Sequence, residues 1–218
     1  MGSVSDDKYL RDIVVSFLLA GRDTVASGLT VFFYLMAQYP DAEARILEES
    51  DRALGQGSKK IPTLEEIRKM NYLQGAIYET LRLYPPVQMD SKFAKNHDVL
   101  PDGTHVKKGT RVSYHPYAMG RMESIWGSDC LEFRPERWLN DDGLFVPVSP
   151  YKYPVFQAGV RVCLGKDMGL LAMKVVAVTL LRRFHIRLAD SNWAPQFIPG
   201  LTATLKGGMP VVVTERFV

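Results

Sequence analysis

The stretch FQAGVRVCLG, residues 156–165, decides how the rest of the sequence is interpreted. Its thiol, Cys163, lies between Gly159 and Gly165 and comes just before a helical pattern. The first turn of a helix presents unpaired N–H groups and the positive end of the helix dipole, and Arg161 adds a full positive charge. These surroundings favour a thiolate over a thiol. The stretch therefore predicts an ionised cysteine that can serve as a ligand.

The other residues of this stretch suit a flat binding partner. Gly159 and Gly165 permit tight turns and a close approach of the backbone, and Phe156 offers an aromatic face beside the sulfur. The alternative is a buried structural cysteine, which is the usual state of a free cysteine. At average residue usage the pattern F-x-x-G-x-R-x-C-x-G should arise about once in several million windows. Its rarity favours a thiolate ligand under a planar cofactor.

The stretch resembles the heme-binding loop of the cytochrome P450 family, and the resemblance extends over essentially the whole chain. It implies that Cys163 is the axial ligand of the iron of heme (iron protoporphyrin IX) and that Arg161 is the partner of a heme propionate. It also implies that Phe156, Gly159 and Gly165 belong to the cofactor site. Thiolate ligation favours cleavage of the O–O bond, which suits oxygen activation rather than oxygen carriage.

Length, composition and charge limit the classes of protein to which the chain can belong. The chain has 218 residues, 46% of them hydrophobic and 23% charged, which is close to an average globular protein. A net charge of +3 with scattered Lys and Arg gives no reason to expect a nucleic-acid partner. No secretory or myristoylation signal opens the sequence. The longest uncharged run, residues 24–40, falls just short of the ~18 largely apolar residues of a membrane span, so we expect a buried helix there.

The spacing of apolar residues predicts a mainly α fold with a small β component. A long helix from residue 5 to residue 40, apolar around much of its circumference, is expected to run through the middle of the domain. Further helices are predicted over residues 41–54, 63–69, 71–84 and 166–184. Short strands are expected between residues 87 and 114, a long ordered loop over 115–155, and a hairpin that pairs 202–206 with 211–214.

Within the long helix, AGRDT at residues 20–24 places polar groups inside an apolar rod. Glycine costs ~1 kcal/mol relative to alanine there, and Thr24 can donate its hydroxyl to the Ala20 carbonyl, so we expect a kink or groove. One interpretation is a glycine that admits a close helix contact. The other follows from the family resemblance, by which Thr24 would hydrogen-bond dioxygen and Asp23 would help relay protons.

Three other groups of residues have weaker signals. Glu79 and Arg82 share a helix face in apolar surroundings, and the family resemblance adds Arg137 as a partner in a buried structural network. Lys92 resembles a residue that lies near a propionate in the family, although an ordinary surface lysine is at least as good an interpretation. The four histidines show no metal-ligand spacing, although His115 could reach a cofactor edge.

The resemblance implies a heme-thiolate monooxygenase that uses dioxygen to hydroxylate an aliphatic C–H bond. Electrons would come from NADPH through NADPH-cytochrome P450 reductase, which would dock on the side of Arg161 and Lys166. Residues 87–94 and 151–156 resemble plant members that hydroxylate fatty-acid chain ends or jasmonoyl-amino-acid conjugates. The implied substrate is therefore lipophilic, with contacts from Val87–Met89 and Leu201–Thr204.

Family chains begin with a membrane anchor and with helices that roof the substrate cavity and touch the distal heme edge, and no counterpart precedes the long helix here. We therefore expect residues 1–218 to be a single partial domain, the C-terminal heme-binding half of the fold. Attachment to the cytosolic face of the endoplasmic reticulum would come only through the N-terminal anchor. Two alternatives are a truncated, catalytically incompetent fragment without a closed dry pocket, and a bare heme-binding module.

Overall fold

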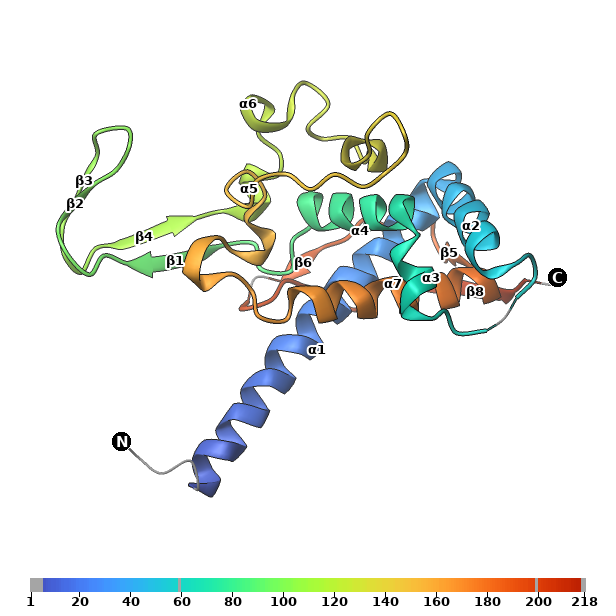
Figure 1. The fold of residues 1–218 in the computed structure, drawn as a ribbon, viewed down its shortest axis with the longest axis horizontal. Helices are drawn as coiled ribbons and strands as arrows, with labels where there is room; N and C mark the ends of the chain where they lie inside the picture. The colour runs from blue at the N-terminus through green and yellow to red at the C-terminus, as the bar shows by residue number, and fades with distance from the viewer. Residues whose placement is uncertain (1–5, 59, 199, 217–218) are drawn as a thin grey trace.

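Helices form most of the structure, a computed structural model that describes residues 6–58, 60–198 and 200–216 (Figure 1). The helices are α1 (Asp7–Gln38), α2 (Pro40–Leu54), α3 (Leu64–Arg68), α4 (Asn71–Leu83), α5 (Pro116–Met119), α6 (Glu123–Trp126) and α7 (Lys166–Arg183). Short 3₁₀ helices are η1 (Pro135–Trp138), η2 (Pro154–Phe156) and η3 (Gly159–Arg161). The prediction of a mainly α fold with a small β component is confirmed.

The helix ends follow the local chemistry of the sequence. The Asp6 side chain accepts the Lys8 N–H at 3.0 Å and caps α1, whereas Ser5 lies outside the described residues. Thr63 and Glu66 exchange side-chain and backbone hydrogen bonds in a capping box that starts α3. Gly55, with φ of 88°, ends α2. The predicted helices therefore agree with the observed ones to within two residues at each described end.

The described strands pair as short antiparallel ladders. The strands are β1 (Asp90–Phe93), β2 (Asp98–Val99), β3 (His105–Val106), β4 (Arg111–Tyr114), β5 (Phe184–Leu188), β6 (Phe197–Ile198), β7 (Thr204–Leu205) and β8 (Val211–Glu215). The ladders are β1–β4, β2–β3, β5–β8 and β6–β7. As Figure 1 shows, β1 and β4 form an arm that extends away from the helices and carries β2 and β3 at its far end.

The predicted hairpin between residues 202–206 and 211–214 is wrong. β7 pairs instead with β6, and β8 pairs with β5 in a five-residue register from Phe184↔Glu215 to Leu188↔Val211. The reason is that the chain continues directly from the end of α7 into β5. Strand β5 offers β8 five residues of unpaired backbone, whereas β7 would offer only two.

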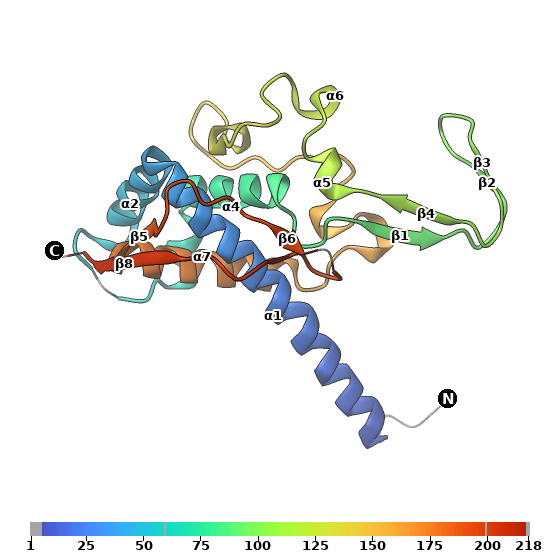
Figure 2. The same ribbon diagram turned by 180° about the vertical axis from the view of Figure 1, so that it is seen from behind.

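Helix α1 divides into two halves with opposite surroundings. Residues from Gly28 to Met36 are mostly buried against α4 and α7. Its first half projects from the body of the molecule in both views (Figures 1 and 2), and large apolar side chains such as Phe17 and Leu18 are 60% and 63% exposed. The prediction that this helix runs through the middle of the domain therefore holds only for its second half.

By length and composition alone, α1 is a candidate membrane span. This corrects the expectation drawn from residues 24–40, because the helix adds the apolar residues that precede Arg22 and Asp23 to that run. The core helix of a soluble protein passes the same test. Only 6% of the window that passes the test in α1 is buried, so this window lies mostly in the exposed first half and not in the half packed in the core.

The core lies where α1, α4 and α7 meet, and glycine allows the close approach. A methyl group on Gly28 of α1 would lie 3.0 Å from Met173 Cε of α7 and 3.2 Å from Leu81 Cδ2 of α4. On the other side of α4, a methyl group on Gly75 would lie 2.8 Å from the Pro135 carbonyl oxygen. Helix α4 is therefore enclosed on two sides and forms the centre of the fold.

The segment 115–155 is ordered, as predicted, because aromatic side chains fasten it to α4. Trp138 is fully buried, with its ring centroid 5.2 Å from that of Tyr78 and 4.9 Å from that of Tyr153. The Tyr153 hydroxyl also donates to the Tyr78 carbonyl at 3.1 Å. These rings act as packing residues, as expected for aromatic side chains that supply core area.

Candidate active site

The loop that carries Cys163 is closed by its own backbone. It runs from η2 through Gln157 and η3 to Gly165, which caps the start of α7. The Cys163 N–H donates to the Phe156 carbonyl at 2.8 Å across the loop. Gly159 has φ of 65°, a left-handed conformation that glycine adopts without strain. The sulfur-bearing residue is thus held a short distance before the N-terminus of a long helix.

The surface around Cys163 is apolar and open. The cysteine is exposed, which argues against the alternative of a buried structural thiol, whereas Cys130 is buried. Val160 is 100% exposed and Leu164 is 85% exposed beside it. A methyl group on Gly165 would meet nothing within 4 Å. One side of the loop therefore offers a sulfur donor in the middle of uncovered apolar side chains.

These residues fit heme. Its flat apolar ring would cover the exposed side chains, its iron would take the Cys163 sulfur, and the exposed Arg161 offers a cation for an anionic substituent. Phe156 lies half-buried behind the loop with its ring packed on Tyr78 and Tyr153. Among the described residues, no group of three or more His, Cys, Asp or Glu side chains is arranged to hold a metal ion.

Asp23 and Thr24 lie on α1, at the boundary between its exposed and packed halves. Thr24 Oγ1 donates to the Ala20 carbonyl at 2.7 Å, as the sequence predicts. Asp23 pairs with Arg22 at 3.0 Å. The helix is continuous here and Figure 1 shows no sharp bend, so the expected kink is wrong. A methyl group on Gly21 would meet none of the described residues within 4 Å, so this part of the chain gives no support to the interpretation of Gly21 as a close-contact glycine.

One contact brings α1 and the cysteine loop to the same region. A methyl group on Gly169, in the first turn of α7, would lie 3.7 Å from Val25 Cγ2, the residue after Thr24. Cys163 is six residues before Gly169. The helix that follows the cysteine loop therefore crosses α1 one residue after Thr24.

The Glu79–Arg82 pair and Arg137 form the predicted buried network. Both Glu79 and Arg82 have fully buried side chains, with Arg82 Nη2 at 2.8 Å from Glu79 Oε1. Arg137 Nε lies 3.3 Å from the same oxygen, and Trp138 Nε1 donates to Oε2 at 2.9 Å. The network lies between α4 and η1, so it supports the long loop and does not reach the exposed face of Cys163.

Arg82 uses every hydrogen of its guanidinium group. Nε and Nη2 donate to the two oxygens of Glu79, and Nη2 also donates to the Glu132 carbonyl at 2.9 Å. Nη1 donates to the carbonyls of Gly120 and Cys130. Five N–H donors thus have five acceptors, which is the full capacity of arginine.

Sequence reasoning missed the residues of β1 and β4 that bind the cysteine loop. Gln157 Nε2 donates to Asp90 Oδ2, and the Tyr114 hydroxyl donates to Gln157 Oε1. Burial would raise the pKa of Asp90, but hydrogen bonds from the Ser91 N–H, Gln157 and Lys92 outweigh burial and lower it. The signal in the sequence was Gln157 itself, a long polar side chain in a loop rich in glycine.

The structure gives a local side-chain partner to Lys92, one of the two residues with open interpretations, and shows none among the described residues for the other, His115. Lys92 Nζ lies 3.2 Å from Asp90 Oδ2, which gives it an ion pair within its own strand. His115 precedes α5 and makes no side-chain cap there. These observations therefore do not place Lys92 or His115 beside Cys163.

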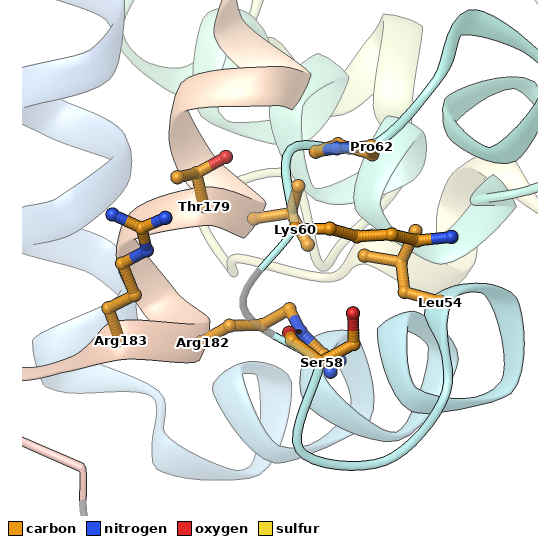
Figure 3. Close-up of a pocket in the computed structure, with 8 residues that line it drawn as sticks. Leu54, Ser58, Lys60, Pro62, Thr179, Arg182 and Arg183 are labelled. Carbon is orange, nitrogen blue, oxygen red and sulfur yellow. Dashed lines mark hydrogen bonds between the residues drawn. The ribbon is translucent and has the colours of Figure 1, made fainter.

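A shallow hollow lies at the other end of α7. Figure 3 shows it between the α2–α3 connection and the end of α7, with Lys60, Arg182 and Arg183 among its lining residues. Because the first 12 residues of α7, or about 18 Å of helix, lie between the Cys163 loop and this hollow, it is not part of the thiol site.

The structure thus has a thiol loop at the start of a long helix, α7, which contacts a second long helix, α1, that carries an acid and a hydroxyl. The sequence model for cytochrome P450 matches residues 2–207. The chain belongs to the cytochrome P450 family. The residues matched include α1, so this helix lies within the region that the family model describes.

Relatives agree with this assignment. Cytochrome P450 94C1 of Arabidopsis thaliana is 58% identical over 214 residues, which cover 97% of this chain and 43% of that protein. Cytochrome P450 94A1 of Vicia sativa is 46% identical over 219 residues, or 97% of this chain and 41% of that protein. A cytochrome P450 of Helianthus annuus is 58% identical over 153 residues, which cover 70% of this chain and 97% of that protein.

The chain spans less than half the length of the first two relatives. Its fold, mostly helical with small antiparallel ladders, is consistent with the C-terminal half of the cytochrome P450 fold. Family membership implies heme with a cysteine thiolate as the cofactor.

Proposed function

We propose that this chain is the heme-binding part of a monooxygenase that hydroxylates an aliphatic C–H bond, with residues 1–218 belonging to a single domain. The observation that carries the proposal is the exposed Cys163, held by the Phe156 carbonyl in the middle of uncovered apolar side chains. Cys163 serves as the axial ligand and Arg161 binds a propionate. Phe156 supports the loop from behind.

When bound, heme supplies the oxygen-activating chemistry, and a thiolate ligand favours cleavage of the O–O bond. The glycines Gly159 and Gly165 keep side chains away from the ring. The protein's own contribution on the other face is proton handling by α1. The Thr24 hydroxyl already donates to Ala20, so its free lone pairs accept a hydrogen bond and can hold a water or substrate hydroxyl. Asp23 is half-exposed beside it, so its carboxylate is open to solvent and is proposed as the other member of the proton relay.

A lipophilic substrate of the fatty-acid or oxylipin class is proposed from the segments near α1. The Ala203 N–H donates to the Pro86 carbonyl at 2.7 Å, and Ser27 Oγ donates to the Ala203 carbonyl at 2.7 Å. These bonds bring Pro86 and Ala203 together beside α1, which supports the expectation that Val87–Met89 and Leu201–Thr204 contact the same substrate. Met89 and Leu201 expose apolar side chains there.

The electron supply is proposed as NADPH through NADPH-cytochrome P450 reductase. Arg161 and Lys166 provide positive charge beside the loop, and Lys166 Nζ lies 5.7 Å from the centroid of the Phe156 ring. Attachment to the cytosolic face of the endoplasmic reticulum is proposed by analogy with the family alone.

Heme binding without turnover is the second candidate. It is favoured by the exposed first half of α1, because within the described residues no element covers the apolar side chains there. An oxygenase needs a closed, dry pocket above the iron. Heme retention with no consumption of reductant would support this candidate.

The test is the absorption spectrum of the purified chain loaded with heme, reduced and treated with carbon monoxide. We expect the red-shifted Soret band of thiolate ligation, and we expect Cys163→Ser to lose it. Cys130→Ala is the matched control, because the Cys130 thiol is buried away from the loop. A band that persists in Cys163→Ser would remove Cys163 as the ligand.

A further inference from the structure

Gln157 has a backbone conformation that glutamine rarely adopts. Its φ is 65° and its ψ is 179°, and among the described residues it is the only non-glycine with positive φ. This region of backbone space is essentially restricted to glycine, and a residue persists there only when its surroundings hold it. The side chain of Gln157 is therefore the place to look for what holds it.

Both ends of the Gln157 amide are bound to the arm formed by β1 and β4. Nε2 donates to Asp90 Oδ2, and Oε1 accepts from the Tyr114 hydroxyl. Asp90 and Tyr114 are paired across the ladder, and their side chains are also in contact, with 3.1 Å between the Tyr114 hydroxyl and Asp90 Oδ2. The amide thus fits a donor and an acceptor that the ladder has already placed.

The arm is a firm support at this point. The Ser91 N–H donates to Asp90 Oδ1 at 2.6 Å, so both carboxylate oxygens of Asp90 have partners. The ladder continues from Asp90↔Tyr114 to Phe93↔Arg111 without a break. A contact made with Asp90 and Tyr114 is therefore a contact with a fixed pair of strands rather than with a free side chain.

The backbone angle at Gln157 acts directly on the cysteine. Rotation about φ of Gln157 turns the peptide group between Phe156 and Gln157, because that group is attached to the Gln157 nitrogen. The carbonyl of this peptide group accepts the Cys163 N–H at 2.8 Å. If φ returned to a common value, the Phe156 carbonyl would turn away from Cys163.

We propose that Gln157 is a positioning residue for Cys163: Asp90 and Tyr114 grip its amide, hold its backbone in the left-handed region, and so aim the Phe156 carbonyl at the Cys163 N–H. The assignment of Cys163 as the heme ligand rests on the proposed function. The grip itself is a property of the polypeptide and can be measured without heme. It links the outer arm of the molecule to the thiol through one side chain.

The test measures hydrogen exchange of the Cys163 amide in the heme-free chain. We expect Gln157→Ala to accelerate exchange at least tenfold, because it keeps the strained φ and removes the grip. Gln157→Gly removes the grip but also the strain, so we expect a smaller acceleration. Asp90→Ala should accelerate exchange, and Asp90→Asn, which keeps an acceptor oxygen, should restore most of the protection.

Ser91→Ala is the matched control, because the Ser91 side chain binds Arg111 at 2.9 Å and does not touch the loop. Exchange at Leu81, fully packed in α4, reports the global fold. If Gln157→Ala also accelerates hydrogen exchange of the Leu81 amide, the global fold has been disturbed. The test then rests on Gln157→Gly and Asp90→Ala. Cys163 exchange that stays within twofold of the wild type in Gln157→Ala, or that rises equally in Ser91→Ala, would overturn the proposal.

Heme loading gives a second, separate readout. In the reduced, carbon monoxide-treated protein we expect Gln157→Ala to shift part of the Soret band to shorter wavelength, because the Phe156 carbonyl no longer holds the Cys163 N–H and the position of the sulfur is less fixed. A wild-type chain without the thiolate band would contradict the proposed function and leave the exchange result standing. Normal exchange in Gln157→Ala would contradict the grip even when the wild type shows the band.

Discussion

Helix α4 and the first half of α1 differ in how completely their side chains are satisfied. In α4 even the charged residues Glu79 and Arg82 are fully buried, and each of their hydrogen-bonding groups has a partner within the protein. In the first half of α1, apolar side chains such as Phe17 and Leu18 face outward. The comparison shows that stability resides in the layer beneath the cysteine loop, while the surfaces of α1 and the loop are available for binding.

The largest expected effect is on the buried network. Glu79→Ala leaves the charges of Arg82 and Arg137 without their carboxylate, so we expect the free energy of unfolding to fall by about 3–5 kcal/mol. Urea unfolding measures this free energy, and the amount of heme that the protein retains should fall in parallel. The control is Glu65→Ala, whose carboxylate is 82% exposed and pairs with Lys69 at 3.1 Å; it should cost under about 1 kcal/mol. Equal losses of unfolding free energy in Glu79→Ala and Glu65→Ala would contradict the difference described between buried and exposed charges.

The pH dependence of stability should report Lys174, a buried cation on α7. Burial lowers its pKa from 10.5 to about 8, although Glu49 opposes this. Between these two pKa values the unfolded chain binds more protons than the folded one, so stability rises with pH, by about 3 kcal/mol in all. Below pH 8 both states are protonated and this contribution is constant.

The measurement is urea unfolding of the wild type and Lys174→Met from pH 7.5 to 10. The unfolding free energy of Lys174→Met should not rise with pH over this range. At pH 7.5 the variant should be more stable than the wild type by about 2 kcal/mol. Identical slopes for the two proteins would show that another group carries the pH dependence.

Two glycine-to-alanine changes sharpen the comparison between the two helices. In Gly75→Ala the new methyl group would lie 2.8 Å from the backbone oxygen of Pro135, so we expect a loss of about 2 kcal/mol. Gly21→Ala in α1 places its methyl group in open space and should stabilise the helix by up to about 1 kcal/mol. Thermal unfolding of both variants gives the sign directly, and the same sign in both would contradict the described packing.

The smallest effect on stability is expected for Thr24→Ala, which should change it by under about 0.5 kcal/mol. Its effect should appear instead in the heme-loaded protein supplied with reductase, as a larger share of electrons released as hydrogen peroxide. Thr30→Ala is the matched control, because Thr30 makes the same bond to the carbonyl four residues back, at 2.8 Å. Equal peroxide release from both variants would remove Thr24 from proton handling.

Local signals in the sequence predicted what depends on neighbours along the chain. The capping box at Thr63 and Glu66, the stop at Gly55 and the back-bond of Thr24 are each set within a few residues. The pattern around Cys163 was long enough to identify its loop, although the exposure of the thiol needed the structure.

Contacts between distant segments could not be predicted in the same way. Strand β8 pairs with β5 rather than with β7, and both partners offer similar β-forming residues, so only the path of the chain after α7 decides. The grip on Gln157 by Asp90 spans 67 residues, and no local pattern encodes such a distance. The open surroundings of Gly21 likewise depend on which elements pack against α1.

The five bonds of Arg82 also imply an order of folding. Its pair with Glu79 is three residues away and can form within an isolated α4, whereas the carbonyls that it binds at Gly120, Cys130 and Glu132 are 38, 48 and 50 residues away. Closing those loops costs entropy that is repaid only when the guanidinium is already in place. We expect α4 to be structured in the folding transition state and the segment 115–155 to settle on it afterwards, as the last part of the support beneath Cys163.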